Sequence, residues 1–112
     1  MEIRENDTLC ILAPLSKKLD KYESERIFFE LEQESRLIAI DLSNVTDCTF
    51  EFLEQLKTFS KRKNLGVFNI PADLFVLFNT MSIDKTANLF VSELDFIEKT
   101  RQLLNRQFSV IY

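Results

Sequence analysis

The chain of 112 residues contains no histidine. Histidine is the usual base that activates a serine or cysteine nucleophile, and it is the commonest ligand of zinc, copper and iron in proteins. Its absence leaves Cys10 and Cys48 without an obvious activating base. We therefore predict that the protein is not an enzyme and that it holds no metal or cofactor.

Glycine and cysteine are also scarce. The single glycine, Gly66, excludes a glycine-rich loop of the kind that cradles phosphate groups. The two cysteines lie far apart in sequence and sit in or beside apolar stretches, so we expect buried, reduced thiols. Reduced thiols are typical of a cytoplasmic protein.

Long apolar runs and an excess of basic charge are absent as well. No run approaches the roughly 20 apolar residues of a membrane helix, so we expect no direct membrane insertion. The first seven residues are charged and lack the apolar stretch of a secretion signal. The net charge of −4, with acidic residues interspersed among basic ones, disfavours nucleic-acid binding.

Apolar and polar residues alternate in a pattern that predicts one α/β domain. Hydrophobic residues make up 46% of the chain and charged residues 29%, as in a folded soluble domain. Short apolar runs predict strands at residues 2–5, 9–12, 37–42, 65–70 and 88–91. Four helices are expected between and after these runs. Alternating strands and helices predict a mixed, mainly parallel sheet of four to five strands with right-handed crossovers.

Helix boundaries can be predicted from capping residues. Asp20 and Glu23 have the spacing of a capping box at the start of the first helix. The second helix is expected to end in a basic run, with Asn64 as a left-handed stop. Ser92, with Glu93, opens the last helix. One face of this helix is marked by Leu94, Ile97, Arg101 and Leu104, and Phe96 and Leu103 flank that face.

The turn before the second helix concentrates polar groups. It contains Thr46, Asp47, Cys48 and Thr49, and Phe50 follows directly. A threonine or aspartate at this place is expected to cap the helix by accepting backbone hydrogen bonds. The alternative is a phosphorylation site at Thr46 or Thr49, because a phosphate is electrostatically favoured at a helix N-terminus.

Three short segments, in this order, carry a family resemblance. Residues 15–20, LSKKLD, are similar to an LxGxLD turn that leads into a helix. Residues 41–43, DLS, followed by residues 49–53, TFEFL, are similar to a strand ending in DLS before a DSSGL turn. Residues 77–84, LFNTMSID, are similar to a leucine-rich helix that leads to TGLD and a short strand. Together with the predicted element order, these segments resemble the STAS domain, the family of bacterial anti-sigma factor antagonists.

This resemblance implies a STAS-like domain over residues 1–105 and an apolar tail over residues 106–112. Counted from Asp41, the serine that a partner kinase phosphorylates in the family falls at Phe50. A phenylalanine ring has no hydroxyl group to phosphorylate. Phe50 therefore marks a degenerate phosphosite, and modification at the usual position is chemically impossible.

The resemblance also implies a partner-binding surface, because in the family this helix and the turn before it engage the partner. We expect this surface to include Thr46, Asp47, Thr49, Phe50, Glu51, Phe78 and Met81. Two orientations of Phe50 remain open at this point. Its ring either projects as an anchor for a partner or packs into the core.

The implied function is protein–protein interaction in signalling and transcription regulation. The expected partner is an anti-sigma factor or a related switch kinase in the bacterial cytoplasm. One alternative is a small accessory subunit that docks on the ATPase of a membrane transporter. Another is a binding domain for a nucleotide or lipid. The apolar tail at residues 106–112 either packs on its own domain or mediates a homodimer.

Overall fold

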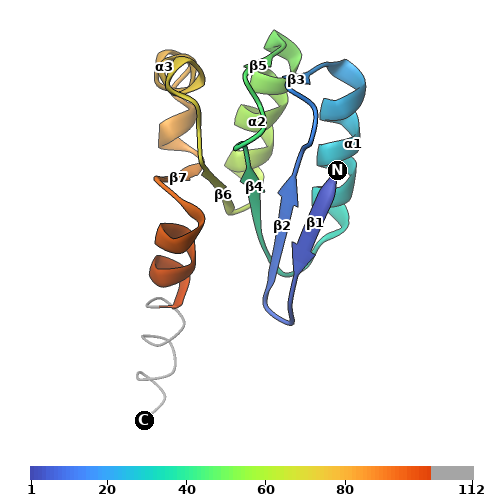
Figure 1. Cartoon of the computed structure of the whole chain (residues 1–112), viewed down its shortest axis with the longest axis vertical. Helices are drawn as coiled ribbons and strands as arrows, with labels where there is room; N and C mark the ends of the chain where they lie inside the picture. Colours follow the sequence, from blue (N-terminus) through green and yellow to red (C-terminus); the bar gives the residue numbers. More distant parts are fainter. Residues whose placement is uncertain (102–112) are drawn as a thin grey trace.

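Strands and helices alternate along residues 1–101, the part of the chain that the computed structural model describes (Figure 1). The elements are β1 (Glu2–Glu5), β2 (Leu9–Ala13), β3 (Lys18–Leu19), α1 (Lys21–Gln33), β4 (Leu37–Asp41), β5 (Asp47–Cys48), α2 (Phe50–Arg62), β6 (Leu65–Phe68), α3 (Ala72–Thr80), a 3-10 turn (Ile83–Lys85) and β7 (Asn88–Phe90). A last helix begins at residue 93 and is described to residue 101. The predicted tail, residues 106–112, lies outside the described residues.

Five strands form the main sheet, in the order β1-β2-β4-β6-β7. Strand β1 is antiparallel to β2, and every other neighbouring pair in this sheet is parallel. The predicted α/β class, the mixed and mainly parallel sheet and the four helices are therefore confirmed. A second, two-stranded sheet joins β3 to β5 and was not predicted.

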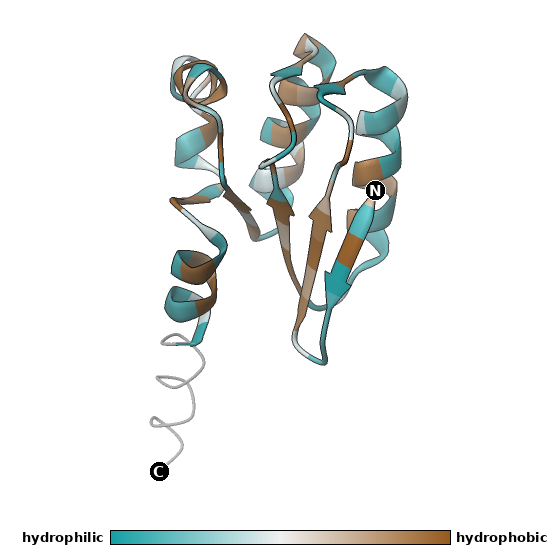
Figure 2. Cartoon of the chain, viewed as in Figure 1, coloured by the Kyte–Doolittle hydropathy of each residue, from teal (hydrophilic) through white to brown (hydrophobic). Residues whose placement is uncertain are grey.

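Helices cover both faces of the main sheet. The first face carries the larger core, where side chains of β2, β4 and β6 pack against α1, α2 and α3. Phe28 of α1 joins the two longer helices, since its ring centroid lies 5.8 Å from that of Phe52 and 5.6 Å from that of Phe59. Figure 2 shows the hydrophobic central strands between helices whose surfaces are part hydrophobic and part hydrophilic.

The second face carries a smaller core under the last helix. Phe96 of that helix packs on Phe68 and Phe90, at centroid distances of 5.7 and 5.2 Å. Gly66 of β6 makes this approach possible, because a Cβ atom at residue 66 would lie 2.8 Å from the Phe96 ring. The glycine is thus required by packing rather than by a turn.

Helix caps follow the sequence in part. The Asp20 side chain accepts a hydrogen bond from the Glu23 backbone N–H at 2.9 Å, which confirms the predicted N-cap of α1. The prediction of Asn64 as a left-handed stop is wrong, because Asn64 does not have a positive φ. Helix α2 ends at Arg62, and its C-cap residue, Lys63, has an extended backbone. Within residues 1–101, the non-glycine residues with positive φ are Asn69, at 55°, and Ser82, at 60°.

The last helix packs on the sheet through Phe96 and Ile97. Leu94 is 65% exposed, whereas Phe96 is buried against the sheet. Within residues 1–101, no helix has both the length and the apolar character required to cross a membrane.

Candidate functional site

The turns that precede α1 and α2 are joined by the small sheet of β3 and β5. In this parallel pair Lys18 lies opposite Asp47 and Leu19 lies opposite Cys48. The Leu19 backbone oxygen also accepts a hydrogen bond from the Thr49 N–H at 3.0 Å. As a result, the two helices start side by side at the end of the main sheet where the parallel strands terminate, the edge where α/β folds commonly bind ligands and partners.

Thr46 is tied to the backbone of the neighbouring turn. The Lys17 carbonyl oxygen accepts hydrogen bonds from the Thr46 N–H at 2.7 Å and from the Asp47 N–H at 3.1 Å. The Thr46 hydroxyl donates to the same oxygen at 3.2 Å. Together these bonds hold the segment before α2 against β3, so the segment is a fixed part of the surface.

Thr49 is the N-cap of α2. Its backbone is extended, with φ −79° and ψ 162°, and its hydroxyl oxygen accepts a hydrogen bond from the Phe52 N–H at 3.4 Å. Capping by Thr49 is therefore confirmed. Asp47 does not cap the helix, because its carboxylate accepts from the Cys48 N–H at 2.8 Å instead. Glu51 lies in the first helical turn, where a negative charge is favoured by the helix dipole.

Phe50 points outward. It is the first residue of α2, and it is 64% exposed, whereas Phe52, two residues later, is completely buried. The aromatic ring at the degenerate phosphosite is therefore available for contact with another molecule. We call the exposed or half-buried residues Thr46, Asp47, Thr49, Phe50 and Glu51 the turn surface.

Phe78 of α3 and Met81, which directly follows this helix, do not extend the turn surface as expected. Phe78 is completely buried, and Met81 is half-buried and packs against the main core. The expectation for Phe78 is wrong because Leu74 and Phe78, four residues apart, form the inward face of α3. The exposed apolar residues of this helix are Phe75, Val76 and Leu77.

Two exposed apolar residues near the turn surface were not predicted. Tyr22, in the first turn of α1, is 79% exposed, and Leu15, before β3, is 59% exposed. A signal for Tyr22 exists in the sequence, because it lies outside the inward face formed by Ile27, Phe28 and Leu31. Leu15 has no comparable periodic signal.

Cys48 adjoins the turn surface but is a weak nucleophile. Burial, together with the nearby Asp47 carboxylate, raises the pKa of its thiol to about 11. Burial also raises the pKa of Cys10, and Glu34 adds to that effect. Both cysteines are free thiols, and neither environment favours the reactive thiolate.

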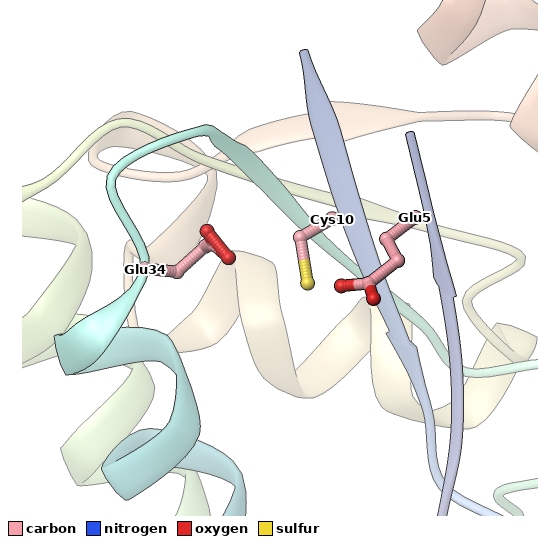
Figure 3. A group of neighbouring side chains, drawn as sticks. All are labelled: Glu5, Cys10 and Glu34. Atoms are coloured by element: carbon pink, nitrogen blue, oxygen red, sulfur yellow. The ribbon is translucent and has the colours of Figure 1, made fainter. Parts of the chain in front are cut away.

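Glu5, Cys10 and Glu34 bring potential metal-ligand atoms within 4.8 Å of one another (Figure 3). Arg36 forms ion pairs with both carboxylates. Its Nη2 atom lies 2.8 Å from the Glu5 carboxylate, and its Nε–H donates a hydrogen bond to Glu34 at 2.9 Å. A cation would have to displace this guanidinium and deprotonate a thiol whose pKa is raised. The geometry therefore favours an ion-pair cluster over a metal site.

Asp41, at the end of β4, is the centre of a buried polar network on the second face. Its carboxylate accepts hydrogen bonds from Arg4 at 2.9 Å, from the Ser43 N–H at 3.0 Å and from the Asn69 side chain at 3.1 Å. Burial alone would raise the pKa of Asp41, but these hydrogen bonds outweigh burial and lower it. The ionised carboxylate thus fixes the start of the segment that leads to the turn surface.

In comparisons with known proteins, no family model and no curated protein matches this chain.

Proposed function

We propose that the protein is a non-enzymatic interaction module, similar to the STAS-domain anti-sigma factor antagonists, that binds a cytoplasmic regulatory protein through the turn surface. The observation that carries this proposal is the exposure of Phe50, 64%, at the start of a helix whose preceding turn is held by backbone hydrogen bonds. An exposed aromatic ring on a rigid support is a typical anchor of protein interfaces.

The chemistry of the surface supports binding rather than catalysis. The Thr49 hydroxyl is engaged in capping, the Thr46 hydroxyl donates to a backbone oxygen, and the Cys48 thiol has a raised pKa. The exposed Tyr22 extends the aromatic character of this end of the molecule, because β3 and β5 align the first turns of α1 and α2. The partner class that fits the STAS resemblance is an anti-sigma factor or related switch kinase.

Regulation would then differ from that of a phosphorylated antagonist. Phe50 stands where the family carries its phosphoacceptor serine, so we expect binding to be constitutive or set by the abundance of the protein. Incubation with the partner kinase and radiolabelled ATP should leave Thr46 and Thr49 unlabelled. Stoichiometric label on either threonine would refute constitutive binding.

A pair of matched phenylalanines allows a direct test. Phe29, on α1, is 63% exposed and thus resembles Phe50 in type and exposure. A photo-crosslinking amino acid is placed at each position in turn in host cells, and captured proteins are identified by mass spectrometry. A partner captured from residue 50 but not from residue 29 is then purified for binding measurements.

We expect Phe50→Ala to weaken binding of the purified partner by roughly 30-fold, the effect of an interface hot spot, and Phe29→Ala to leave it unchanged. Equal binding by wild type and Phe50→Ala would show that the turn surface is not the interface. A membrane-associated ATPase as partner would favour the transporter accessory role. A melting shift with a nucleotide or lipid would favour ligand binding.

A further inference from the structure

The second face of the main sheet is covered unevenly along β2 and β4. Ile11 and Ala39, in the interior of these strands, are both buried there. Leu9 and Leu37, the first residues of the same strands, lie opposite each other and point to the same face, because side chains alternate along a strand. Both are only half-buried. Within residues 1–101, the cover of the second face therefore ends before the starts of the two strands.

A groove of about 540 Å³ lies at this end of the sheet, beside the last helix. Leu37, Phe90 and Phe96 contribute to its apolar lining. The groove also has a polar lining, which consists of Asn64, Asn88, Lys99 and Thr100. The kind of molecule or segment that the groove fits depends on whether these polar groups are free.

The two asparagines and the lysine of this lining already have partners within the chain. The Asn88 side-chain amide donates a hydrogen bond to Asn64 Oδ1 at 2.8 Å. Lys99 is the only charged residue among the described residues that line the groove, and its Nζ atom lies 3.3 Å from the Asp95 carboxylate. The groove therefore offers apolar surface rather than a free charge, and it fits an apolar side chain.

The last helix runs from the end of β4 toward its start. Arg4 binds both Asp41, the last residue of β4, and Glu93, at the beginning of the helix, whereas Thr100 lines the groove together with Leu37. From Asp41 back to Leu37 the strand spans roughly 13 Å, at about 3.3 Å per residue. A helix that rises about 1.5 Å per residue covers this length in about nine residues. Counted from Glu93, the helix reaches the level of Leu37 near residue 102.

The sequence continues the inward stripe of this helix beyond residue 101. Phe96, Ile97 and Thr100 are buried or half-buried, which is the spacing of a helix face that meets a core. Steps of three and four residues from Thr100 reach Leu103 and Leu104. The residues on either side, at 102 and 105, are glutamine and asparagine. Apolar residues thus fall on the inward stripe and polar residues beside it.

We propose that the groove is the docking site of this chain's own residues 102–105, which continue the last helix and complete the smaller core. Leu103 follows Phe96 by two turns and therefore lies on the same side of the helix. Phe96 lines the groove, so the side chain of Leu103 enters it beside Leu37.

Leu104 follows Ile97 by two turns and lies on the other side of the stripe. Ile97 packs in the smaller core with Leu9, and Leu104 extends this contact over the start of β2. The occupant is the same chain because Thr100 already lines the groove, so the next helical turn begins at its edge. A separate molecule would have to displace that turn.

Methyl NMR of the full chain tests the proposal directly. With labelled leucine methyl groups, we expect nuclear Overhauser cross-peaks that join Leu103 to Leu37 and Leu104 to Leu9. In a mixture of labelled and unlabelled chains, an isotope-filtered spectrum reports contacts between copies only, and it should lack these cross-peaks. Cross-peaks that appear only between copies would assign the groove to a second copy and overturn the proposal. The absence of both kinds would also overturn it.

A pair of double variants provides the second arm. Leu103→Ala with Leu104→Ala removes the two inward side chains but keeps good helix formers, so any loss of stability reports packing. We expect its urea midpoint to fall by roughly 1 M. Gln102→Ala with Asn105→Ala changes the neighbouring outward positions and should not lower the midpoint. Equal midpoints for the two double variants would overturn the proposal, and circular dichroism verifies that both are folded.

Discussion

At the scale of single residues, Thr49 decides how the turn surface is held. Its hydroxyl satisfies one of the N–H groups that every helix start leaves without an internal partner. We expect Thr49→Ala to lower the free energy of unfolding by about 1 kcal/mol, measured by urea denaturation. Thr49→Ser, which keeps the hydroxyl, should retain most of this stability.

Thr46→Ala is the matched control for this prediction. Its hydroxyl binds the Lys17 oxygen in an exposed setting, and the same oxygen still receives two backbone N–H groups after the substitution. The loss should stay below about 0.5 kcal/mol. Equal losses at residues 46 and 49 would contradict a specific capping role for Thr49.

Gly66 controls the second core. A methyl group at this position would lie 2.8 Å from the Phe96 ring and 3.2 Å from the Phe90 ring. We expect Gly66→Ala to cost about 1–3 kcal/mol in the free energy of unfolding through overpacking. In the Phe96→Leu background the same change should cost less, because the smaller side chain leaves room for the methyl group. An undiminished cost in that background would exclude the contact with Phe96 as the cause.

Local signals in the sequence were enough to predict the N-caps of α1 and α2, but not the end of α2 or the direction of each aromatic ring. Asp20 and Thr49 could be predicted because a cap is a contact within three residues along the chain. Phe50 and Phe78 could not be oriented in advance. The helix that contains Phe78 is apolar on nearly every face, so its inward side depends on the sheet that it meets.

At the scale of elements, the alternation of apolar and polar segments in the sequence predicted the order of the longer strands and helices. The shortest elements were not predicted. Strands β3 and β5 have two residues each, too few for a periodic pattern. Their pairing nevertheless aligns the turns that form the candidate surface. The sequence therefore predicted which residues precede α2, but it did not predict the pairing of β3 with β5 that holds them in place.

The end of α1 should contribute a defined pH dependence. Hydrogen bonding to Arg36 lowers the pKa of Glu34 from 4.5 to about 2. Because the folded-state pKa is depressed, the stabilisation is present above about pH 4.5 and is lost as the pH falls toward 2. We expect Glu34→Gln to be less stable than the wild type near pH 6.

The measurement is a set of urea titrations between pH 6 and 2.5. The difference between wild type and Glu34→Gln should shrink steadily below pH 4.5. Glu30→Gln, at an exposed position on α1, serves as the matched control and should show no such trend. A difference that is constant with pH would mean that the ion pair with Arg36 does not set the pKa of Glu34.

At the scale of the whole molecule, the sheet order was not predicted in detail, yet it determines which residues meet across the chain. The antiparallel start of the sheet places β1 beside β2 and carries Arg4 onto the second face, opposite Ile11. From there Arg4 reaches both Asp41 and Glu93 of the last helix. Arg4 is separated from Asp41 by 37 positions along the chain and from Glu93 by 89 positions. Contacts over such distances leave no local signal in the sequence.

We therefore expect the contacts of Arg4 to couple the stability of β1, β4 and the last helix. Arg4→Met removes the cation that neutralises the buried Asp41 carboxylate, and we expect it to cost about 2 kcal/mol in the free energy of unfolding. Asp41→Asn should also destabilise, but the double variant should cost less than the sum, with a coupling of about 1 kcal/mol. Hydrogen exchange in residues 93–101 should accelerate in Arg4→Met. Glu2→Gln, which removes only the exposed partner of Arg4, is the control. If the losses in the free energy of unfolding of Arg4→Met and Asp41→Asn are additive, and hydrogen exchange in residues 93–101 is unchanged, the coupling is refuted.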